Sequence, residues 1–213
     1  MGAYTLRLFE DRLLNATRLS LAATPRVVYA LTGDVFVTTG HGRVAVEGDH
    51  AWHGTSECEL EAGPGGAMIL RYELERGDTP AGDTRAALSH ALALDDAGEY
   101  LMRCDRVDFG PGGEALPHGH KGGGIRRLIA GELEVRVGQA HGRVMKPGDA
   151  WFESGVEPVY AIASATEPTS FIRVSILPRS IRGQSSIVYV DPAHAAMKPR
   201  KYTVFVDEPI VLP

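Results

Sequence analysis

Two histidines separated by a single residue are the side chains of this sequence that most plainly could carry chemistry. His118 and His120 lie at the end of a stretch rich in glycine and proline, residues 110–120. Alternate residues of a β-strand point to the same face, so both imidazoles could reach one bound ion or molecule. Imidazole binds several transition metals and accepts protons near neutral pH. The alternative is that both histidines are polar residues of a loop.

Two imidazoles alone make a poor metal site, so a third ligand must come from elsewhere in the chain. Glu153 and Glu157 lie just after a tryptophan, in the sequence Trp151-Phe152-Glu153. We favour Glu153 as the ligand, because it follows the aromatic pair directly at the end of a predicted strand. The alternative for both carboxylates is an exposed loop position. Trp151 is expected to form part of the core or the wall of a pocket.

The elements that must position these side chains belong to an internal repeat. Three short segments recur in the same order at an offset of 98 to 100 residues, namely 30–37 with 128–135, 41–44 with 141–144, and 48–49 with 148–149. A single match could arise by chance. Three matches in order at nearly one offset are typical of a duplicated domain.

Each copy has the pattern of short β-strands. Leu133, Val135 and Val137 alternate with polar residues, a period of two that suits a half-buried strand. The chain has 25 glycines and 13 prolines, enough to place turns between many short strands. We therefore predict an all-β protein with a sandwich or barrel architecture. One short helix is expected between the copies, over residues 85–94.

The second copy resembles the cupin superfamily, whose first motif reads G-x5-H-x-H-x(3,4)-E-x6-G. Gly112, the histidines of His118-x-His120, and Gly131 match positions of this motif. The resemblance implies two tandem cupin-type barrels, which are jelly rolls of the double-stranded β-helix kind.

The resemblance divides the chain into four segments. They are a degenerate N-terminal barrel at 1–77, a connector at 78–97, a C-terminal barrel with the His-x-His pair at 98–180, and a C-terminal strand extension at 181–213. Within the extension, residues 187–190 and 202–206 are predicted strands. We expect them to cover an exposed sheet edge, either in the same chain or in a second subunit.

The sequence departs from the cupin pattern at two ligand positions. Gly124 stands where the family has its metal-binding glutamate, and Pro158 stands where the second motif ends in a histidine. We interpret the three glycines at 122–124 as open space beside the two histidines. In the first copy, the ligand positions align with Ser20, Ala22 and Arg26, so that barrel is expected to be structural or regulatory.

Arg126 indicates what kind of substrate the barrel could bind. If position 124 faces the barrel interior, period-two alternation turns Arg126 inward and Arg127 outward. A buried guanidinium needs an anionic partner, either Glu153 or the carboxylate of a substrate. We therefore expect Arg126 and Glu153 to be catalytic, and Arg126, Trp151 and Glu157 to line the substrate pocket. The alternative is an Arg126–Glu153 ion pair that is purely structural.

The cupin resemblance implies dioxygenase, decarboxylase, isomerase or lyase chemistry. Arg126 favours a small carboxylate or oxo-acid as the substrate of such an enzyme. A divalent transition metal (Fe, Ni, Zn or Mn), held by His118, His120 and Glu153, would act as a Lewis acid. Two alternatives stay open. One is a non-catalytic barrel that binds a small molecule, and the other is a metal-free isomerase in which His118 or His120 is the general base.

Composition and charge disfavour several other classes of protein. The formal net charge of −5 offers no basic excess for nucleic acid, and no apolar run approaches the roughly 20 residues that span a bilayer. Only two cysteines occur, Cys58 and Cys104, and the N-terminus has no signal-peptide core, which favours a cytoplasmic location. The expected partners are a small-molecule ligand and a second copy of the chain, as a homodimer.

Overall fold

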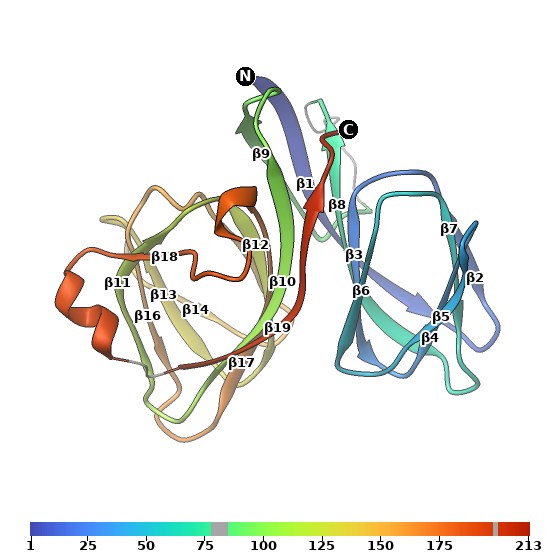
Figure 1. The fold of residues 1–213 in the computed structure, drawn as a ribbon. Helices are drawn as coiled ribbons and strands as arrows, with labels where there is room; N and C mark the ends of the chain where they lie inside the picture. Colours follow the sequence, from blue (N-terminus) through green and yellow to red (C-terminus); the bar gives the residue numbers. More distant parts are fainter. Residues whose placement is uncertain (78–84, 198–199) are drawn as a thin grey trace. The chain divides into compact units, whose positions relative to one another are not determined.

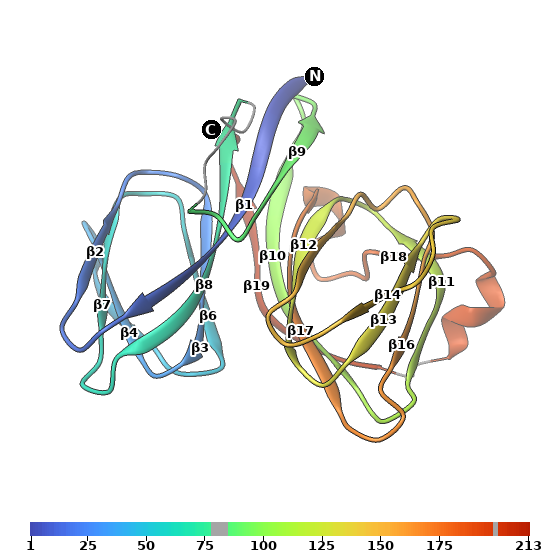
Figure 2. The same ribbon diagram turned by 180° about the vertical axis from the view of Figure 1, so that it is seen from behind.

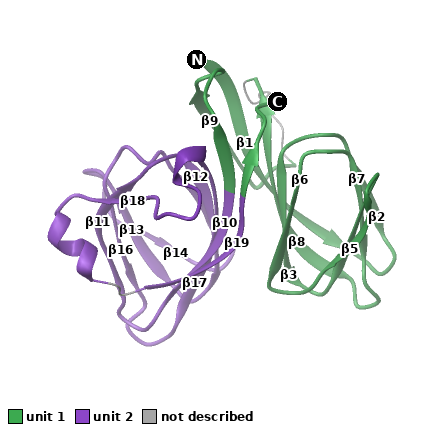
Figure 3. Ribbon diagram, viewed as in Figure 1, with its two compact units in different colours: residues 1–102, 208–213 green, residues 103–207 purple. Residues whose placement is uncertain are grey.

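The chain folds into two compact units, coloured separately in Figure 3. The computed structural model describes residues 1–77, 85–197 and 200–213, and the ribbons of Figures 1 and 2 show their arrangement from two sides. Residues 1–102 and 208–213 form the first unit, and residues 103–207 form the second. Strands dominate both units, which confirms the prediction of an all-β protein.

The first unit encloses an apolar core between two β-sheets. Its strands are β1 (Gly2–Leu13), β2 (Arg18–Leu21), β3 (Arg26–Thr32), β4 (Val35–Thr39), β5 (Gly42–Val46), β6 (His50–Gly54), β7 (Cys58–Ala62), β8 (Ala67–Arg76) and β9 (Leu88–Leu94). One sheet has the order β6-β3-β8-β1-β9 and the other β2-β7-β4-β5. Alternate residues of these strands point inward, and Val35, Val37 and Leu60 are fully buried between the sheets.

The second unit is built in the same way. Its strands are β10 (Tyr100–Phe109), β11 (Glu114–His120), β12 (Gly124–Ala130), β13 (Leu133–Val137), β14 (Arg143–Met145), β15 (Ala150–Glu153), β16 (Val159–Ala163), β17 (Thr169–Pro178), β18 (Ile187–Tyr189) and β19 (Arg200–Ile210), with short 3₁₀ helices η1 (Arg179–Ile181) and η2 (Pro192–Ala196). The first residues of β10, up to 102, and the last residues of β19, from 208, belong to the first compact unit. The sheets have the orders β15-β12-β17-β10-β19 and β14-β13-β16-β11-β18.

The strand order confirms the duplication. The run β6-β3-β8-β1 of the first unit recurs as β15-β12-β17-β10, and β2-β7-β4-β5 recurs as β11-β16-β13-β14. Even the irregularities correspond, because the pairing shifts register between Ala30 and Thr32 in β3 and between Leu128 and Ala130 in β12. The repeated sequence segments therefore specify repeated strand pairings.

The prediction of a helix between the two copies is wrong. Residues 88–94 form β9, which pairs antiparallel with β1 along its whole length. Leu92 and Leu94 are buried while Ala91 and Ala93 are exposed, a period of two that fits a strand and not a helix. Residues 78–84 of the predicted connector lie outside the described residues.

The strands of the C-terminal extension lie where the sequence predicts, at the edges of sheets in the same chain. β18 pairs with the edge of β11, and β19 lies beside β10. Pairing satisfies backbone groups that an open edge would leave available to other chains. As a consequence, β18 and β19 bring side chains from the end of the chain to the second barrel.

Helices contribute little to the part of the chain that the structure describes. None of its helices has the length and apolar character needed to cross a lipid bilayer.

Candidate functional site

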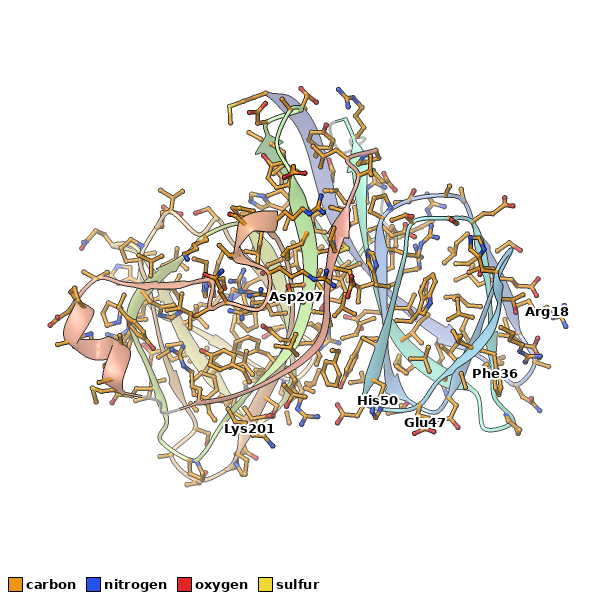
Figure 4. All side chains as sticks on the ribbon, viewed as in Figure 1. Arg18, Phe36, Glu47, His50, Lys201 and Asp207 are labelled. Carbon is orange, nitrogen blue, oxygen red and sulfur yellow. The ribbon has the colours of Figure 1, made fainter. Side chains whose placement is uncertain are left out.

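The two histidines share one face of β11 and point into the second barrel. Their relative exposures are 4% for His118 and 9% for His120, and their rings meet edge to face with centroids 4.9 Å apart. β11 changes register between Ala115 and His118 in its pairing with β16, just before the histidine pair. Figure 4 shows the side chains on the ribbon of both barrels.

His118 is held as a neutral imidazole with one nitrogen available. Its Nδ1 lies 2.7 Å from the backbone oxygen of Leu116. A carbonyl can only accept a hydrogen bond, so the proton is on Nδ1 and the lone pair is on Nε2. Burial, with a smaller contribution from the charge of Arg200, lowers the pKa of His118 to about 4. The ring is therefore neutral at pH 7, with Nε2 free to accept a proton or bind a ligand.

His120 is also neutral, but its proton is on the other ring nitrogen, Nε2. Its Nε2 lies 3.2 Å from Oε2 of Glu153 and donates to that carboxylate. Burial lowers the pKa of His120 to about 3, even though the hydrogen bond to Glu153 opposes this shift. In this tautomer Nδ1 carries the lone pair, and it is buried with no hydrogen-bond partner among the described residues.

Glu153 is the centre of a hydrogen-bonded network. It lies opposite Gly124 in the pairing of β15 with β12, so its side chain enters the barrel beside the vacant glutamate position. Oε2 is 2.7 Å from Nη2 of Arg126, and Oε1 accepts a hydrogen bond of 2.8 Å from the indole of Trp151. Burial alone would raise the pKa of Glu153, but Arg126, His120 and Trp151 together hold it well below its usual value.

Arg126 faces the barrel interior, as the alternation of β12 predicts, and is only 1% exposed. Besides contacting Glu153, its guanidinium donates to the backbone oxygen of Gly124. Arg127 lies on the other face of β12, as the same alternation predicts. It is nevertheless buried there, and its Nη1 donates to the backbone oxygen of Leu128.

Two further arginines approach the histidines from other strands. Arg173 of β17 forms two hydrogen bonds with the carboxylate of Asp105, at 2.9 and 2.6 Å. Arg200 of β19 donates to the hydroxyl of Tyr189 and lies over the rings of Phe109 and Tyr202. Among the described residues, no carboxylate forms an ion pair with Arg200, and its Nε is buried without a hydrogen-bond partner.

These side chains surround a small cavity. It has a volume of about 20 Å³, room for a single water molecule, so a larger ligand enters only when a lining side chain moves. Its polar lining consists of His118, His120, Arg126, Glu153, Arg173, Arg200 and Tyr202. Trp151 also lines it, whereas Glu157 is exposed at the end of the barrel and does not. Arg200 and Tyr202 were not assigned to the site from sequence, because only the barrel brings their strand beside β11.

Contrary to the expectation from sequence, the glycines at 122–124 do not open space beside the histidines. A Cβ at Gly124 would lie 2.4 Å from the backbone oxygen of Val174 and 2.5 Å from Oγ of Ser175. A Cβ at Gly122 would lie 2.2 Å from the backbone oxygen of Ile176. Both positions therefore face β17, and glycine allows that strand to approach closely.

We expect the substitution Gly124→Ala to destabilise the protein by about 1–3 kcal/mol, because the added methyl group must push β17 away from β12. Gly110→Ala is the matched control, because a Cβ there meets no atom within 4 Å. Urea denaturation of both variants checks the prediction. Equal stability of Gly124→Ala and Gly110→Ala would contradict the close approach.

The predicted metal ligands converge, but they are not free to act as a set of three. Both oxygens of Glu153 are already bound, and the adjacent charge of Arg126 opposes a dication. In the described part of the chain, no group of three or more His, Cys, Asp or Glu side chains is placed to hold a metal ion. Only two of the three predicted ligands, His118 and His120, keep a nitrogen available.

The described residues of the first barrel form no comparable site. Arg26 occupies the position equivalent to Gly124 and pairs with Glu73 at 2.9 Å. The same carboxylate pairs with Arg71 at 2.9 Å, and Arg71 also pairs with Asp11 at 2.7 Å. These buried cations are neutralised within the barrel, in contrast to Arg200 of the second barrel.

Comparison with known proteins identifies the fold. No protein-family model matches the sequence, and no curated protein matches it. A variant of oxalate decarboxylase from Bacillus subtilis is similar in structure, with a TM-score of 0.67, 13% identity, and coverage of 92% of this chain and 78% of that one. A cupin 2 conserved barrel domain protein from Leptotrichia buccalis has a TM-score of 0.51 and 13% identity, over 82% of this chain and 84% of that one. The architecture is therefore that of tandem cupin barrels.

Proposed function

We propose that the second barrel is the active site of an enzyme that acts on a small carboxylate or oxo-acid. The observation that carries the proposal is an excess of positive charge around a neutral imidazole. Arg126 and Arg173 have the carboxylates of Glu153 and Asp105 as partners, whereas Arg200 has none among the described residues. Arg200 is half-buried and its Nε is fully buried, and a cation in such a position is stabilised by an anionic ligand.

His118 is the group that would perform the chemistry. It lines the same cavity as Arg200, and Nε2 can accept a proton because Nδ1 is held by the backbone. Proton removal next to a carboxylate or carbonyl group is a step of isomerase and lyase reactions. Arg126 and Glu153 would then orient His120 and shape the pocket, and they would not touch the substrate. The similarity to oxalate decarboxylase supports a carboxylate as the substrate class.

The test combines ligand binding with turnover. We expect oxalate, pyruvate or acetate to bind in calorimetry, and His118→Gln to lower turnover of the accepted substrate by about 10²–10⁴-fold. His118→Gln should leave carboxylate affinity within a few-fold of wild type. His141→Gln, at an exposed histidine of the same unit, is the control and should change neither quantity. Binding without turnover of any acid would favour the non-catalytic barrel, and no binding at all would refute the proposal.

A metal-dependent form of the same enzyme is the second candidate. The observation that favours it is that two imidazole nitrogens, Nε2 of His118 and Nδ1 of His120, have no hydrogen-bond partner among the described residues. A metal held there would need oxygens of the substrate to complete its coordination, and it would supply Lewis-acid chemistry. Elemental analysis of protein purified without a histidine tag distinguishes the two candidates. About one equivalent of a transition metal, lost in the His118→Ala/His120→Ala variant, would favour the metal form.

A further inference from the structure

A second, larger cavity adjoins the one beside the histidines. It has a volume of about 360 Å³, against about 20 Å³ for the cavity that contains His118. The two cavities share two lining residues, Arg173 and Tyr202. We call this larger cavity the outer cavity and the one that contains His118 the inner cavity. The outer cavity is otherwise walled by β10, β19 and the segment that leads into β18. Its size lies at the lower end of the range for small-molecule pockets.

The charges of the outer cavity cancel within the protein. Arg103 forms two hydrogen bonds with the carboxylate of Asp207, at 2.8 and 3.0 Å, and Arg173 is paired with Asp105. Asp207, labelled on β19 in Figure 4, also accepts a hydrogen bond of 2.7 Å from the backbone nitrogen of Gly183. Each ionic group of this cavity therefore has a partner, and the cavity offers no unsatisfied charge to a ligand.

The charges of the inner cavity, in contrast, do not all have partners within the described part of the protein. It is lined by Arg200, whose guanidinium is paired with no carboxylate of the described residues. Val204 and Ile187 supply apolar wall to the outer cavity, whereas Arg200 does not line it. A ligand that satisfies both cavities thus needs a negative charge at one end and an uncharged remainder.

Tyr202 lines both cavities and packs against two arginines. The centroid of its ring lies 5.8 Å from the guanidinium carbon of Arg173 and 5.7 Å from that of Arg200. Its hydroxyl makes no hydrogen bond with the described part of the chain, so packing against these cations holds the ring in place. A ring held in this way can turn aside for a ligand without the loss of a hydrogen bond.

We propose that the ligand of the second barrel is a carboxylate with an uncharged body of several carbon atoms. The carboxylate binds Arg200 beside His118, and the body displaces the ring of Tyr202 and occupies the outer cavity. This inference rests on the proposed function and narrows its substrate class. A two-carbon dicarboxylate would leave the outer cavity empty and would place its second charge near groups that are already paired.

The test measures affinity along a series of linear carboxylates. Calorimetry with acetate, butyrate and hexanoate should show an increase in affinity of roughly three- to fourfold for each methylene group added. Hexanol, which lacks the charge, should bind at least tenfold more weakly than hexanoate. Arg200→Gln should weaken hexanoate about tenfold or more and leave hexanol unchanged.

A variant that fills the outer cavity isolates the role of the body. Val204→Trp is expected to remove the gain from chain length and to leave acetate affinity unchanged, because Val204 lines only the outer cavity. Lys201→Trp is the control, on the same strand but in the lining of neither cavity. Affinity that is independent of chain length, or unaffected by Arg200→Gln, would overturn this inference while leaving the proposed function intact. Failure of every carboxylate to bind would overturn both.

Discussion

Replacing Glu153 by glutamine is expected to lower the free energy of unfolding by about 3–5 kcal/mol, the range for breaking a buried ion pair. Glu153 and Arg126 are 5% and 1% exposed, and their side chains meet at 2.7 Å. Glutamine preserves the volume but removes the charge that neutralises the guanidinium inside the barrel. The substitution also disturbs the hydrogen bonds with His120 and Trp151, which adds to the loss.

The chain contains a matched control for this prediction. Glu134 and Arg136 form an ion pair at the same distance, 2.7 Å, but their side chains are 32% and 52% exposed. Solvent screens that pair, so Glu134→Gln should change stability by no more than about 1 kcal/mol. Urea denaturation of both variants, with one protocol, measures the difference. A smaller loss in Glu153→Gln than in Glu134→Gln would show that burial does not govern these pairs.

The second large effect is a loss of stability on acidification. The pKa of His118 is lowered to about 4 and that of His120 to about 3, both mainly by burial. In the unfolded chain both histidines titrate near their ordinary value of about 6.5. Below that pH the unfolded state therefore binds protons that the folded state does not. The stabilisation is complete above about pH 6.5 and is lost as the pH falls through the folded values, by at most about 1.4 kcal/mol per pH unit for each histidine.

Denaturation midpoints measured between pH 7 and pH 5 check this prediction, because most carboxylates remain ionised in that window. The double variant His118→Gln/His120→Gln should show a flatter dependence of stability on pH. His41→Gln/His141→Gln, which removes two exposed histidines, should keep the slope of the wild type. Equal slopes in both double variants would place the acid sensitivity elsewhere. Below about pH 4.5, protonation of Glu153 should add a further loss, because its pKa is also lowered in the folded state.

Local pattern was enough to predict the barrels and the inner layer of the site. Period-two alternation places His118 and His120 on one face, and the same rule turns Arg126 inward. The internal repeat indicated two similar units, and the strand order bears this out. A buried guanidinium needs an anion, which left Glu153 or a substrate carboxylate as the partner of Arg126, and in the structure Glu153 is 2.7 Å away.

Errors arose where close packing outweighed local pattern. The glycines at 122–124 were predicted to open space beside the histidines, but the absence of their side chains instead allows β17 to approach closely. A one-dimensional sequence does not state how near two strands approach. The expected helix over residues 85–94 failed for a related reason, since the free edge of β1 offers backbone hydrogen bonds that β9 takes as a strand.

The sequence by itself determined the class of fold and which neighbouring residues face inward, because both depend on spacing over a few residues. It also determined the duplication, because three segments recur in order at nearly one offset. The tertiary structure decided the charge of the cavity and its size. Arg200 and Tyr202 reach His118 only because β19 lies beside β10, and Asp105 neutralises Arg173 across two strands that are far apart in the chain. Contacts of this kind depend on strand order and sheet closure, which no local pattern contains.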